Sequence, residues 1–204
     1  AEQKAKNRSE EEKAKGGLQP KEKPAAAAAA APKTTKAKKP PTKTHSGNKW
    51  LIENFCEGEP IVLDETRLTD VVYIGNCNGA TVQIKGKINS MTIDGCNKVG
   101  VVCENIVGVI EVVNSNSIQL QITGKTPCVN IDKCNGVQLY LSAAALEEGN
   151  PTNIFTSKTS AINVLTPGAT PDDDMIEQAI PEQFKTIVTP QKKLVTEFAS
   201  IGGF

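Results

Sequence analysis

Cysteine and asparagine recur at a fixed spacing, and cysteine is a residue type that can bind metals or form disulfides. Steps of 19 residues give Cys77, Cys96, Ser115 and Cys134. The chain has six cysteines but no C-x-x-C pair, so the sequence does not predict a zinc site. Neighbouring repeats would bring Cys77 and Cys96 close enough for a disulfide. Because serine replaces cysteine at one step, we interpret the column as buried structural thiols.

Residues for acid–base or metal chemistry are scarce elsewhere. His45 is the only histidine, and it precedes the repeat in a basic segment. Asp94 and Asp132 share one column of the repeat, but the column is otherwise not acidic, which argues against the paired carboxylates of a glycosidase. The acidic run 172–174 lacks the glycine and glutamate spacing of a calcium loop. We expect no metal, no cofactor and a binding protein instead of an enzyme.

The spacing of the apolar residues explains the repeat. Val72-x-Ile74 and Ala80-x-Val82-x-Ile84 alternate apolar and other residues, which indicates strands with one buried face. A unit of 19 residues is too short for a helical repeat, which needs more than about 30. Stacked coils pair each strand in register with its counterpart at about 4.8 Å. The sequence predicts an all-β parallel β-helix over 71–141, with coils of about 19 residues.

Two columns are expected to form the corners of the coil. The position after the cysteine column is always asparagine, at Asn78, Asn97, Asn116 and Asn135. Asparagine tolerates left-handed backbone, and stacked asparagines can bond to one another. A second corner is expected at Gly86, Asn105 and Gly124.

The charge is distributed unevenly along the chain. Residues 1–49 contain 13 Lys/Arg and 5 Asp/Glu, a net charge of +8, whereas 50–204 have a net charge of −8. Prolines and an alanine run fill 1–49, so we expect a disordered basic linker there and a folded domain over 50–204. The linker has no interleaved aromatic residues and the chain no apolar run of 18 residues, so we expect neither nucleic-acid binding nor membrane insertion.

The chain begins at alanine, and we expect it to be part of a longer protein.

The segments around the repeat have their own patterns. Strands are expected at 50–55, with Trp50 capping the open end, and at 61–63 in a shorter or irregular coil. An insertion with one helical turn is expected at 142–153, and an acidic loop at 167–181. The runs 183–188 and 193–198 around Thr189-Pro190 predict a hairpin. Its edges need either a fold-back onto the same chain or a second chain.

Several segments resemble the C-terminal domain of cyclase-associated proteins. These are 49–54 (KWLIEN), 82–90 (VQIKGKINS), 181–186 (PEQFKT) and 193–196 (KLVT). The resemblance covers about 50–204, in order. It implies a right-handed parallel β-helix whose C-terminal hairpin, within 183–204, is exchanged between two subunits. The final residues, 199–204, depart from the ending of that family.

The same resemblance implies a function. Members of this family bind monomeric actin, preferably with ADP bound, and promote its nucleotide exchange, which recycles monomers from ADF/cofilin. The expected partners are therefore actin and a second copy of this chain, in the cytoplasm and at the cytoskeleton.

Outward cationic and polar side chains are the candidates for actin binding, because they suit an acidic partner. They are expected on one side of the sheet or nearby. The candidates are Lys85, Lys87, Asn89, Ser90, Thr92, Lys98, Lys125, Lys185, Ser200 and Ile201. The candidates for dimerisation are Phe184, Ile187, Leu194, Val195 and Phe198.

Two other functions compete with actin binding. A structural scaffold that only dimerises a larger protein would use the same hairpin. A GTPase-activating protein similar to tubulin cofactor C would need a Gln-x-Arg motif, but the triplets that begin at Gln83, Gln119 and Gln138 end in Lys, Gln and Tyr. Lysine cannot reproduce the two-pronged hydrogen bonding of arginine.

Overall fold

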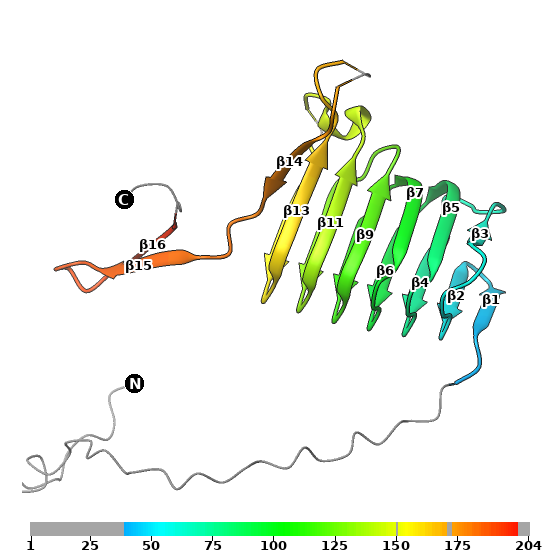
Figure 1. Cartoon of the computed structure of the whole chain (residues 1–204). Helices are drawn as coiled ribbons and strands as arrows, with labels where there is room; N and C mark the ends of the chain where they lie inside the picture. Colours follow the sequence, from blue (N-terminus) through cyan, green and yellow to red (C-terminus); the bar gives the residue numbers. More distant parts are fainter. Residues whose placement is uncertain (1–38, 150, 171–172, 200–204) are drawn as a thin grey trace, which may run out of the picture. The chain divides into compact units, whose positions relative to one another are not determined.

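The computed structural model describes residues 39–149, 151–170 and 173–199. Its strands form two stacked sheets, A and B, and a separate hairpin (Figure 1). Sheet A contains, in spatial order, β1 (Thr42–Ser46), β2 (Lys49–Glu53), β4 (Val71–Gly75), β6 (Ser90–Asp94), β8 (Val109–Val113), β10 (Cys128–Asp132) and β12 (Asn153–Ser157). Sheet B contains β3 (Ile61–Leu63), β5 (Thr81–Ile88), β7 (Gly100–Ile106), β9 (Asn116–Ile122), β11 (Asn135–Leu141), β13 (Ser160–Thr166) and β14 (Ile176–Ala179).

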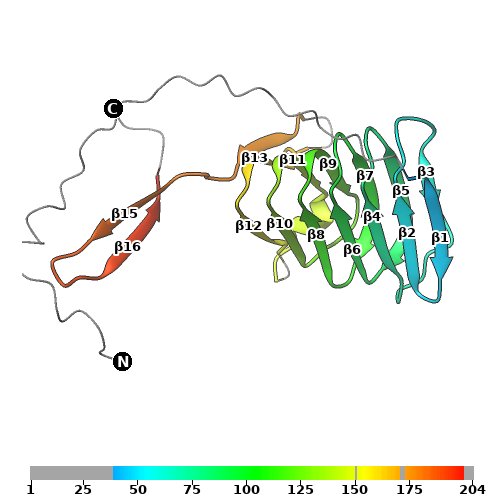
Figure 2. The same cartoon turned by 90° about the horizontal axis from the view of Figure 1, so that it is seen from below.

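The chain alternates between the two sheets, one strand in each per coil, and successive coils stack in parallel (Figure 2). Val72 pairs with Met91, Met91 with Ile110, and Val129 with Ile110, which reproduces the predicted 19-residue step. The predicted parallel β-helix is confirmed.

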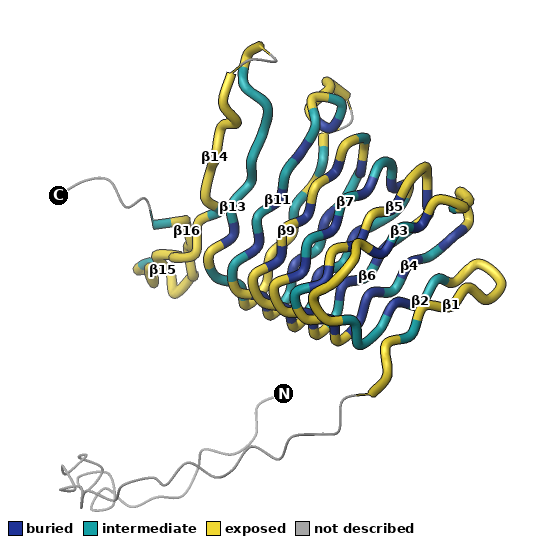
Figure 3. The backbone as a smooth tube through the Cα atoms, turned by 45° about the vertical axis from the view of Figure 1, so that its right-hand side comes forward, coloured by how far each residue is buried: buried dark blue, intermediate teal, exposed yellow. Residues whose placement is uncertain are grey.

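The core lies between the two sheets. Figure 3 shows buried positions alternating with intermediate or exposed ones along the central strands of the coils. The predicted inward positions are buried in all four coils, including the column Cys77, Cys96, Ser115 and Cys134. The inward side chains of one coil contact those of the same columns in the next coil. The hydrophobic stabilisation is therefore distributed along the whole stack.

The turns from sheet A to sheet B differ from the prediction in one respect. The asparagine column does not have positive φ. The left-handed residues flank it, as Asn76 (φ 53°) and Gly79 (φ 72°) do in the first regular coil. Asn78 and Asn97 instead continue the ladder as bridge residues, and the Asn97 Nδ2 donates to Asn78 Oδ1 at 2.9 Å. The predicted bond between stacked asparagine side chains is therefore present between Asn78 and Asn97, but the turn is made by the flanking residues.

The turns from sheet B back to sheet A are also displaced from the prediction. Gly86 and Asn105 lie inside β5 and β7, so the corner expected at these two residues is wrong. Gly86 (φ 83°) sits in a bulge of β5, where the pairing with β7 shifts register. Gly124 does lie in a turn, and a Cβ there would clash with Asn105 Oδ1 and come within 2.7 Å of the Glu104 carbonyl oxygen. Glycine is thus needed at 124 for space.

The folded part begins earlier than expected. β1 pairs antiparallel with β2, so the assignment of 42–46 to the linker is wrong, and His45 is not part of a tether. β1 is exposed and has no apolar alternation, which is why no strand is predicted there from the sequence. The ring of His45 stacks on Trp50 at 4.1 Å between centroids. β1 and Trp50 together close this end of sheet A.

A buried carboxylate holds this closed end together. Asp70 is fully buried and accepts hydrogen bonds from the Arg67 backbone N–H (3.0 Å) and from Trp50 Nε1 (3.3 Å). Arg67 Nη2 also lies 2.9 Å from Asp70 Oδ1 and 3.2 Å from His45 Nε2. Burial by itself raises the pKa of Asp70, but the hydrogen bonds and charge of Arg67, with the Trp50 bond, outweigh it and hold the pKa below its usual value.

The first and last coils are irregular. Lys49 pairs with Val71, so the first coil is longer than 19 residues and not shorter. The predicted insertion contains the 3-10 helix η1 (Ala143–Leu146), and the register resumes with Ile162 paired to Val137, as expected. The expectation of a loop over 167–181 is wrong in part, because β14 pairs antiparallel with β13. Like β1, β14 is exposed and shows no periodicity.

Replacing Asp70 with asparagine tests the closed end. Asp70→Asn should lower the free energy of unfolding at pH 7 by about 2 kcal/mol, since charged hydrogen bonds are lost. The lowered pKa means that the contribution of the carboxylate is complete above the unfolded pKa of about 3.9 and is lost as pH falls through the folded pKa. The unaltered chain and Asp70→Asn should therefore differ in unfolding free energy at pH 7, and this difference should shrink at about pH 3. Urea unfolding at the two pH values measures it.

The matched control is Asp64→Asn, which changes an exposed aspartate in the connection between β3 and β4, where Asp70 also lies. It should leave the unfolding midpoint nearly unchanged. Equal losses in the two variants would contradict a specific role for Asp70.

Candidate functional site

Three of the predicted lysines lie near one another at the edge where sheet B turns back to sheet A. Lys87 pairs with Asn105 in the next strand, and Asn105 Oδ1 accepts from the Lys125 backbone N–H at 3.1 Å. Lys87, Asn105 and Lys125, with Val107 and Pro127, line a depression of about 400 Å³. Lys85 is exposed on the same strand as Lys87. Lys125 thus lies next to the column of Lys87.

The electrostatic environments of these lysines differ. Lys125 forms an ion pair with Glu147, which follows η1. Lys85 and Lys87 form no ion pair with the part of the chain that the structure describes. Because they are unpaired there, these two ammonium groups are the ones available to an acidic partner.

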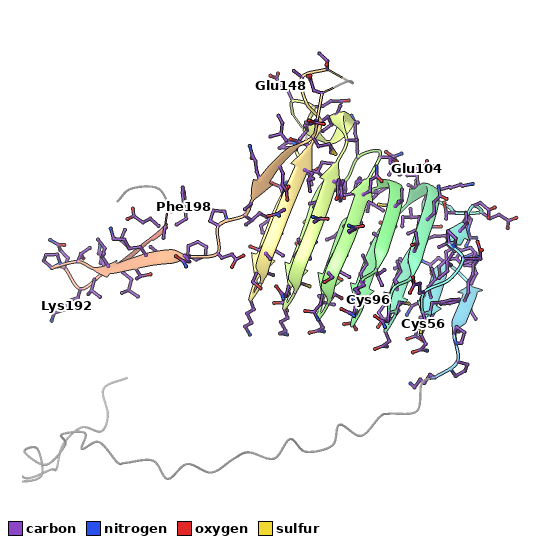
Figure 4. All side chains as sticks on the ribbon, viewed as in Figure 1. Cys56, Cys96, Glu104, Glu148, Lys192 and Phe198 are labelled. Carbon is purple, nitrogen blue, oxygen red and sulfur yellow. The ribbon has the colours of Figure 1, made fainter. Side chains whose placement is uncertain are left out.

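The other predicted residues do not lie on one side. Ser90 and Thr92 belong to β6 in sheet A, where Thr92 Oγ1 donates to Glu111 Oε2 at 3.4 Å. Lys98 has φ 53° and lies in a turn from sheet A to sheet B. That turn contains Cys96, which Figure 4 shows at the coil edge opposite Glu104 of β7. Asn89 is the turn residue between β5 and β6. These residues, expected on the same side or nearby, therefore lie on sheet A and in the turns at both of its edges.

The outer face of sheet A is acidic. Glu53, Asp94, Glu111 and Asp132 lie on its strands β2, β6, β8 and β10. Tyr73 donates to Asp94 Oδ2 at 3.1 Å; burial and this bond raise the pKa of Tyr73 to about 12. Asp94 and Asp132 share a row with Gly75 and Val113, as predicted. The described residues contain no cluster of three or more His, Cys, Asp or Glu suited to a metal ion.

The outer face of sheet B is different, because two rows across five strands carry no charge. The first row is Thr81, Gly100, Gln119, Gln138 and Asn163. The second row is Gln83, Val102, Gln121, Tyr140 and Leu165. We call these two rows the uncharged face. Sequence reasoning did not select this face, although the alternation within each strand was sufficient to find it.

Two depressions lie on the uncharged face. One, of about 500 Å³, is lined by Lys98, Ser117, Gln119, Gln138 and Asn163, among others. The second, of about 430 Å³, is lined by residues of both rows and by Met175, which comes from the connection between β13 and β14. The surface is thus hollowed at two places where small residues alternate with amides.

The hairpin consists of β15 (Phe184–Val188) and β16 (Leu194–Phe198), paired antiparallel as predicted. Every residue of both strands is exposed. Directly paired residues share a face, so Phe184, Phe198, Val188 and Leu194 form one apolar face with Thr186 and Thr196 between them. We call this the aromatic face of the hairpin; Figure 4 labels Phe198 on it.

The opposite face of the hairpin is mixed. It carries Ile187 and Val195 beside Lys185, whose Nζ lies 3.3 Å from Glu197 Oε1. The five predicted dimerisation residues are therefore divided between two faces, and Val188 of the aromatic face is not among them. Lys185, predicted to bind actin, has an acidic neighbour on its own hairpin. Ser200 and Ile201 lie outside the described residues.

Comparison with known proteins identifies the domain. The family model described as "Adenylate cyclase associated (CAP) C terminal" matches residues 39–201. The chain belongs to the cyclase-associated protein family. It is 42% identical over 154 residues to an adenylyl cyclase-associated protein of Dictyostelium discoideum and 40% identical over 155 residues to adenylyl cyclase-associated protein 2 of Mus musculus. Each alignment covers 76% of this chain.

A solved structure supports the same assignment. The cyclase-associated protein of Cryptosporidium parvum matches with a TM-score of 0.71 and 31% identity, over 79% of this chain and 96% of that one. The chain spans about a third of the length of the curated relatives, 32% of the Dictyostelium protein and 31% of the mouse protein. The family match begins at residue 39, just before β1, which agrees with the earlier start of the folded part.

Four of the six cysteines of this cyclase-associated protein domain are buried in its core, namely Cys77, Cys96, Cys103 and Cys134. Cys96 lies beside Cys77 in the next coil, and its hydrogen bond to Cys77, with burial, raises its pKa. Burial raises the pKa of Cys103 to about 12.

Among the described residues no helix is long and apolar enough to cross a bilayer.

Alkylation tests the interpretation of the thiols. In native protein, iodoacetamide should modify exposed Cys56 first, while Cys77, Cys96, Cys103 and Cys134 should react only after denaturation, because burial limits access. Burial also raises the pKa of Cys103 and Cys134. The hydrogen bond with Cys96 lowers the pKa of Cys77 to about 7, so access alone protects that thiol. Peptide mass spectrometry before and after urea treatment measures this order. Rapid native labelling of Cys96 would contradict a purely structural role.

Proposed function

We propose that this chain binds monomeric actin, with a preference for the ADP-bound form, and accelerates exchange of the bound nucleotide. Membership of the cyclase-associated protein family, carried by the match over residues 39–201, is the observation that supports the proposal. The absence of a Gln-x-Arg motif argues against the alternative of a GTPase-activating protein. By this function the chain would act in the cytoplasm, recycling monomers released with ADF/cofilin.

The mechanism is conformational and needs no catalytic group on this chain. A rigid surface that binds one state of actin more tightly shifts the population toward that state. If that state releases nucleotide faster, exchange is accelerated. The coupling is reciprocal, so the ATP-bound monomer binds the chain more weakly. Two sheets held by in-register hydrogen bonds supply such a rigid surface.

Nucleotide release tests this proposal directly. The 204-residue chain should accelerate release of a fluorescent ADP analogue from actin monomers in a dose-dependent manner. Stopped-flow fluorescence measures the release rate. Unchanged release would contradict the proposed exchange activity, and unchanged release without measurable actin binding would favour a scaffold that only dimerises a larger protein.

The unpaired lysines test where electrostatic contacts lie. Lys85→Ala combined with Lys87→Ala should weaken actin binding about three- to tenfold, chiefly through a slower association rate, and leave the unfolding midpoint unchanged. Lys192→Ala combined with Lys193→Ala removes the same charge from the hairpin turn and should have little effect. Full affinity in the first variant would remove Lys85 and Lys87 from the proposed site.

We also propose that the hairpin mediates a homodimer by exchange between subunits. Large apolar side chains are exposed on its aromatic face, by 66% at Phe184 and 63% at Phe198, and such patches mark protein–protein contacts. β12 ends sheet A with only β10 as its neighbour among the described strands, so an unpaired strand edge is also present there.

Light scattering measures the dimer. Phe184→Ser combined with Phe198→Ser should yield monomers, and so should a variant that ends at Glu182. Lys185→Ala combined with Glu197→Ala changes the opposite face and should remain dimeric. A dimer that persists without 183–204 would contradict the exchange of the hairpin.

A further inference from the structure

Threonine precedes proline at four places in the chain, and the last of these pairs is followed by basic residues. The pairs begin at Thr126, Thr166, Thr170 and Thr189. Within the four residues after each threonine, lysine occurs only in the last case, in the run 189–193 (TPQKK). A hydroxyl followed by proline and then by a base is the pattern that proline-directed protein kinases recognise, since kinases select substrates by the charges that flank the acceptor.

The other three threonines are poor acceptors for such a kinase. Thr126 is only 2% exposed. Thr166 is half-buried and pairs with Ile176 of β14, so its backbone is held in sheet B. Thr170 precedes three aspartates, whose negative charge opposes a cleft that recognises bases. Burial, strand pairing and local charge therefore argue against one site each.

Thr189 begins the turn of the exposed hairpin. Its backbone N–H donates to the Lys193 carbonyl oxygen at 2.9 Å, and the Lys192 N–H donates to the Thr189 carbonyl oxygen at 2.8 Å. Lys192 has φ 60°, so residues 190–192 form a three-residue hairpin loop with a left-handed last residue. Pro190 fits the first position of this loop, because proline favours the start of such turns. The Thr-Pro pair thus lies at the tip of the hairpin, where Figure 4 labels Lys192.

The hydroxyl of Thr189 has basic groups beside it. It accepts a hydrogen bond from the Lys193 backbone N–H at 3.2 Å, and this bond leaves the hydroxyl proton unused. Lys192 and Lys193 are exposed and form no ion pair within the described ranges, unlike Lys185, which is paired with Glu197. Two unpaired ammonium groups are therefore available to the acidic groups of a kinase cleft.

We propose that Thr189 is a phosphorylation site for a protein kinase that recognises proline after the acceptor and a base two residues beyond the proline. In this step the Thr189 hydroxyl oxygen attacks the γ-phosphorus of magnesium-bound ATP. The bond from that phosphorus to the leaving oxygen of ADP breaks, and the hydroxyl proton passes to the catalytic aspartate of the kinase. The products are phosphothreonine and ADP. The inference is independent of actin binding.

The hairpin gives a kinase access to this hydroxyl. A kinase cleft binds its substrate as an extended segment, so the turn must open. Every residue of β15 and β16 is exposed, and each strand has the other as its only partner among the described strands. A two-stranded hairpin without further packing is marginally stable in water, so opening it costs far less than opening a coil.

The position of Thr189 on the hairpin also keeps it accessible in a dimer. Thr189 pairs with Lys193 and therefore lies on the mixed face, opposite Phe184 and Phe198. A homodimer formed through the aromatic face leaves this side of the tip uncovered. A phosphate there, with a charge of about −1.5 to −2 at pH 7, would neutralise the two lysines of the tip.

Phosphorylation in vitro tests the proposal. The 204-residue chain, incubated with magnesium-ATP and a purified kinase of the cyclin-dependent class, should be phosphorylated on Thr189, as located by peptide mass spectrometry. Thr189→Val should abolish this product, and Thr189→Ser should restore it. Pro190→Ala should lower the initial rate at least about tenfold and Lys192→Ala about three- to tenfold, because each removes a recognised group.

The matched control is Thr166→Val, which removes the hydroxyl of another Thr-Pro pair and should leave the rate of phosphorylation unchanged. Phosphate on other residues with none on Thr189 overturns the proposal. So does modification of Thr189 that occurs only after urea denaturation, because the native hairpin would then not admit the kinase. A rate that Pro190→Ala leaves unchanged would remove the site from this class of kinase and also overturns it.

Discussion

The in-register hydrogen bonding between successive coils is the interaction on which the rest of this structure depends. Each strand pairs with the strand one repeat away, as Ile74 pairs with Ile93 and Ile93 pairs with Val112. This pairing places equivalent residues above one another, so an inward position is inward in every coil. The core is consequently a set of columns, and its stability is a sum of contacts between neighbours.

The same constraint explains the behaviour of the turns and the ends. A turn must return the chain to register in every coil, which requires left-handed residues at Asn76 and Gly79 and a hydrogen-bonded asparagine between them. At the ends no further coil satisfies the last strand. The structure solves this with antiparallel partners: β1 closes sheet A beside β2, and β14 closes sheet B beside β13. At β12 the edge remains unpaired within the described chain.

Register leaves the outward positions chemically free, and the two sheets use that freedom differently. Carboxylates occur in two of the outward rows of sheet A, whereas the first two outward rows of sheet B contain none. A rigid scaffold of this kind separates stability from recognition, because outward substitutions need not disturb the inward columns. The family assignment and the distribution of charge together direct attention to Lys85 and Lys87 at the edge of sheet B and to the aromatic face of the hairpin.

The sequence by itself determined the coil length, the inward columns and the hairpin, because these follow from periodicity of apolar residues and from local turn signals. It also carried the family resemblance. Only the tertiary structure showed that β1 and β14 are strands, since Thr42–Ser46 and Ile176–Ala179 have no buried face and are ordered by backbone pairing alone. It likewise decided which outward residues meet. Lys87 and Lys125 come together, whereas Thr92 and Lys98 fall on different parts of the coil, because proximity between outward side chains depends on which sheet and which turn each one occupies.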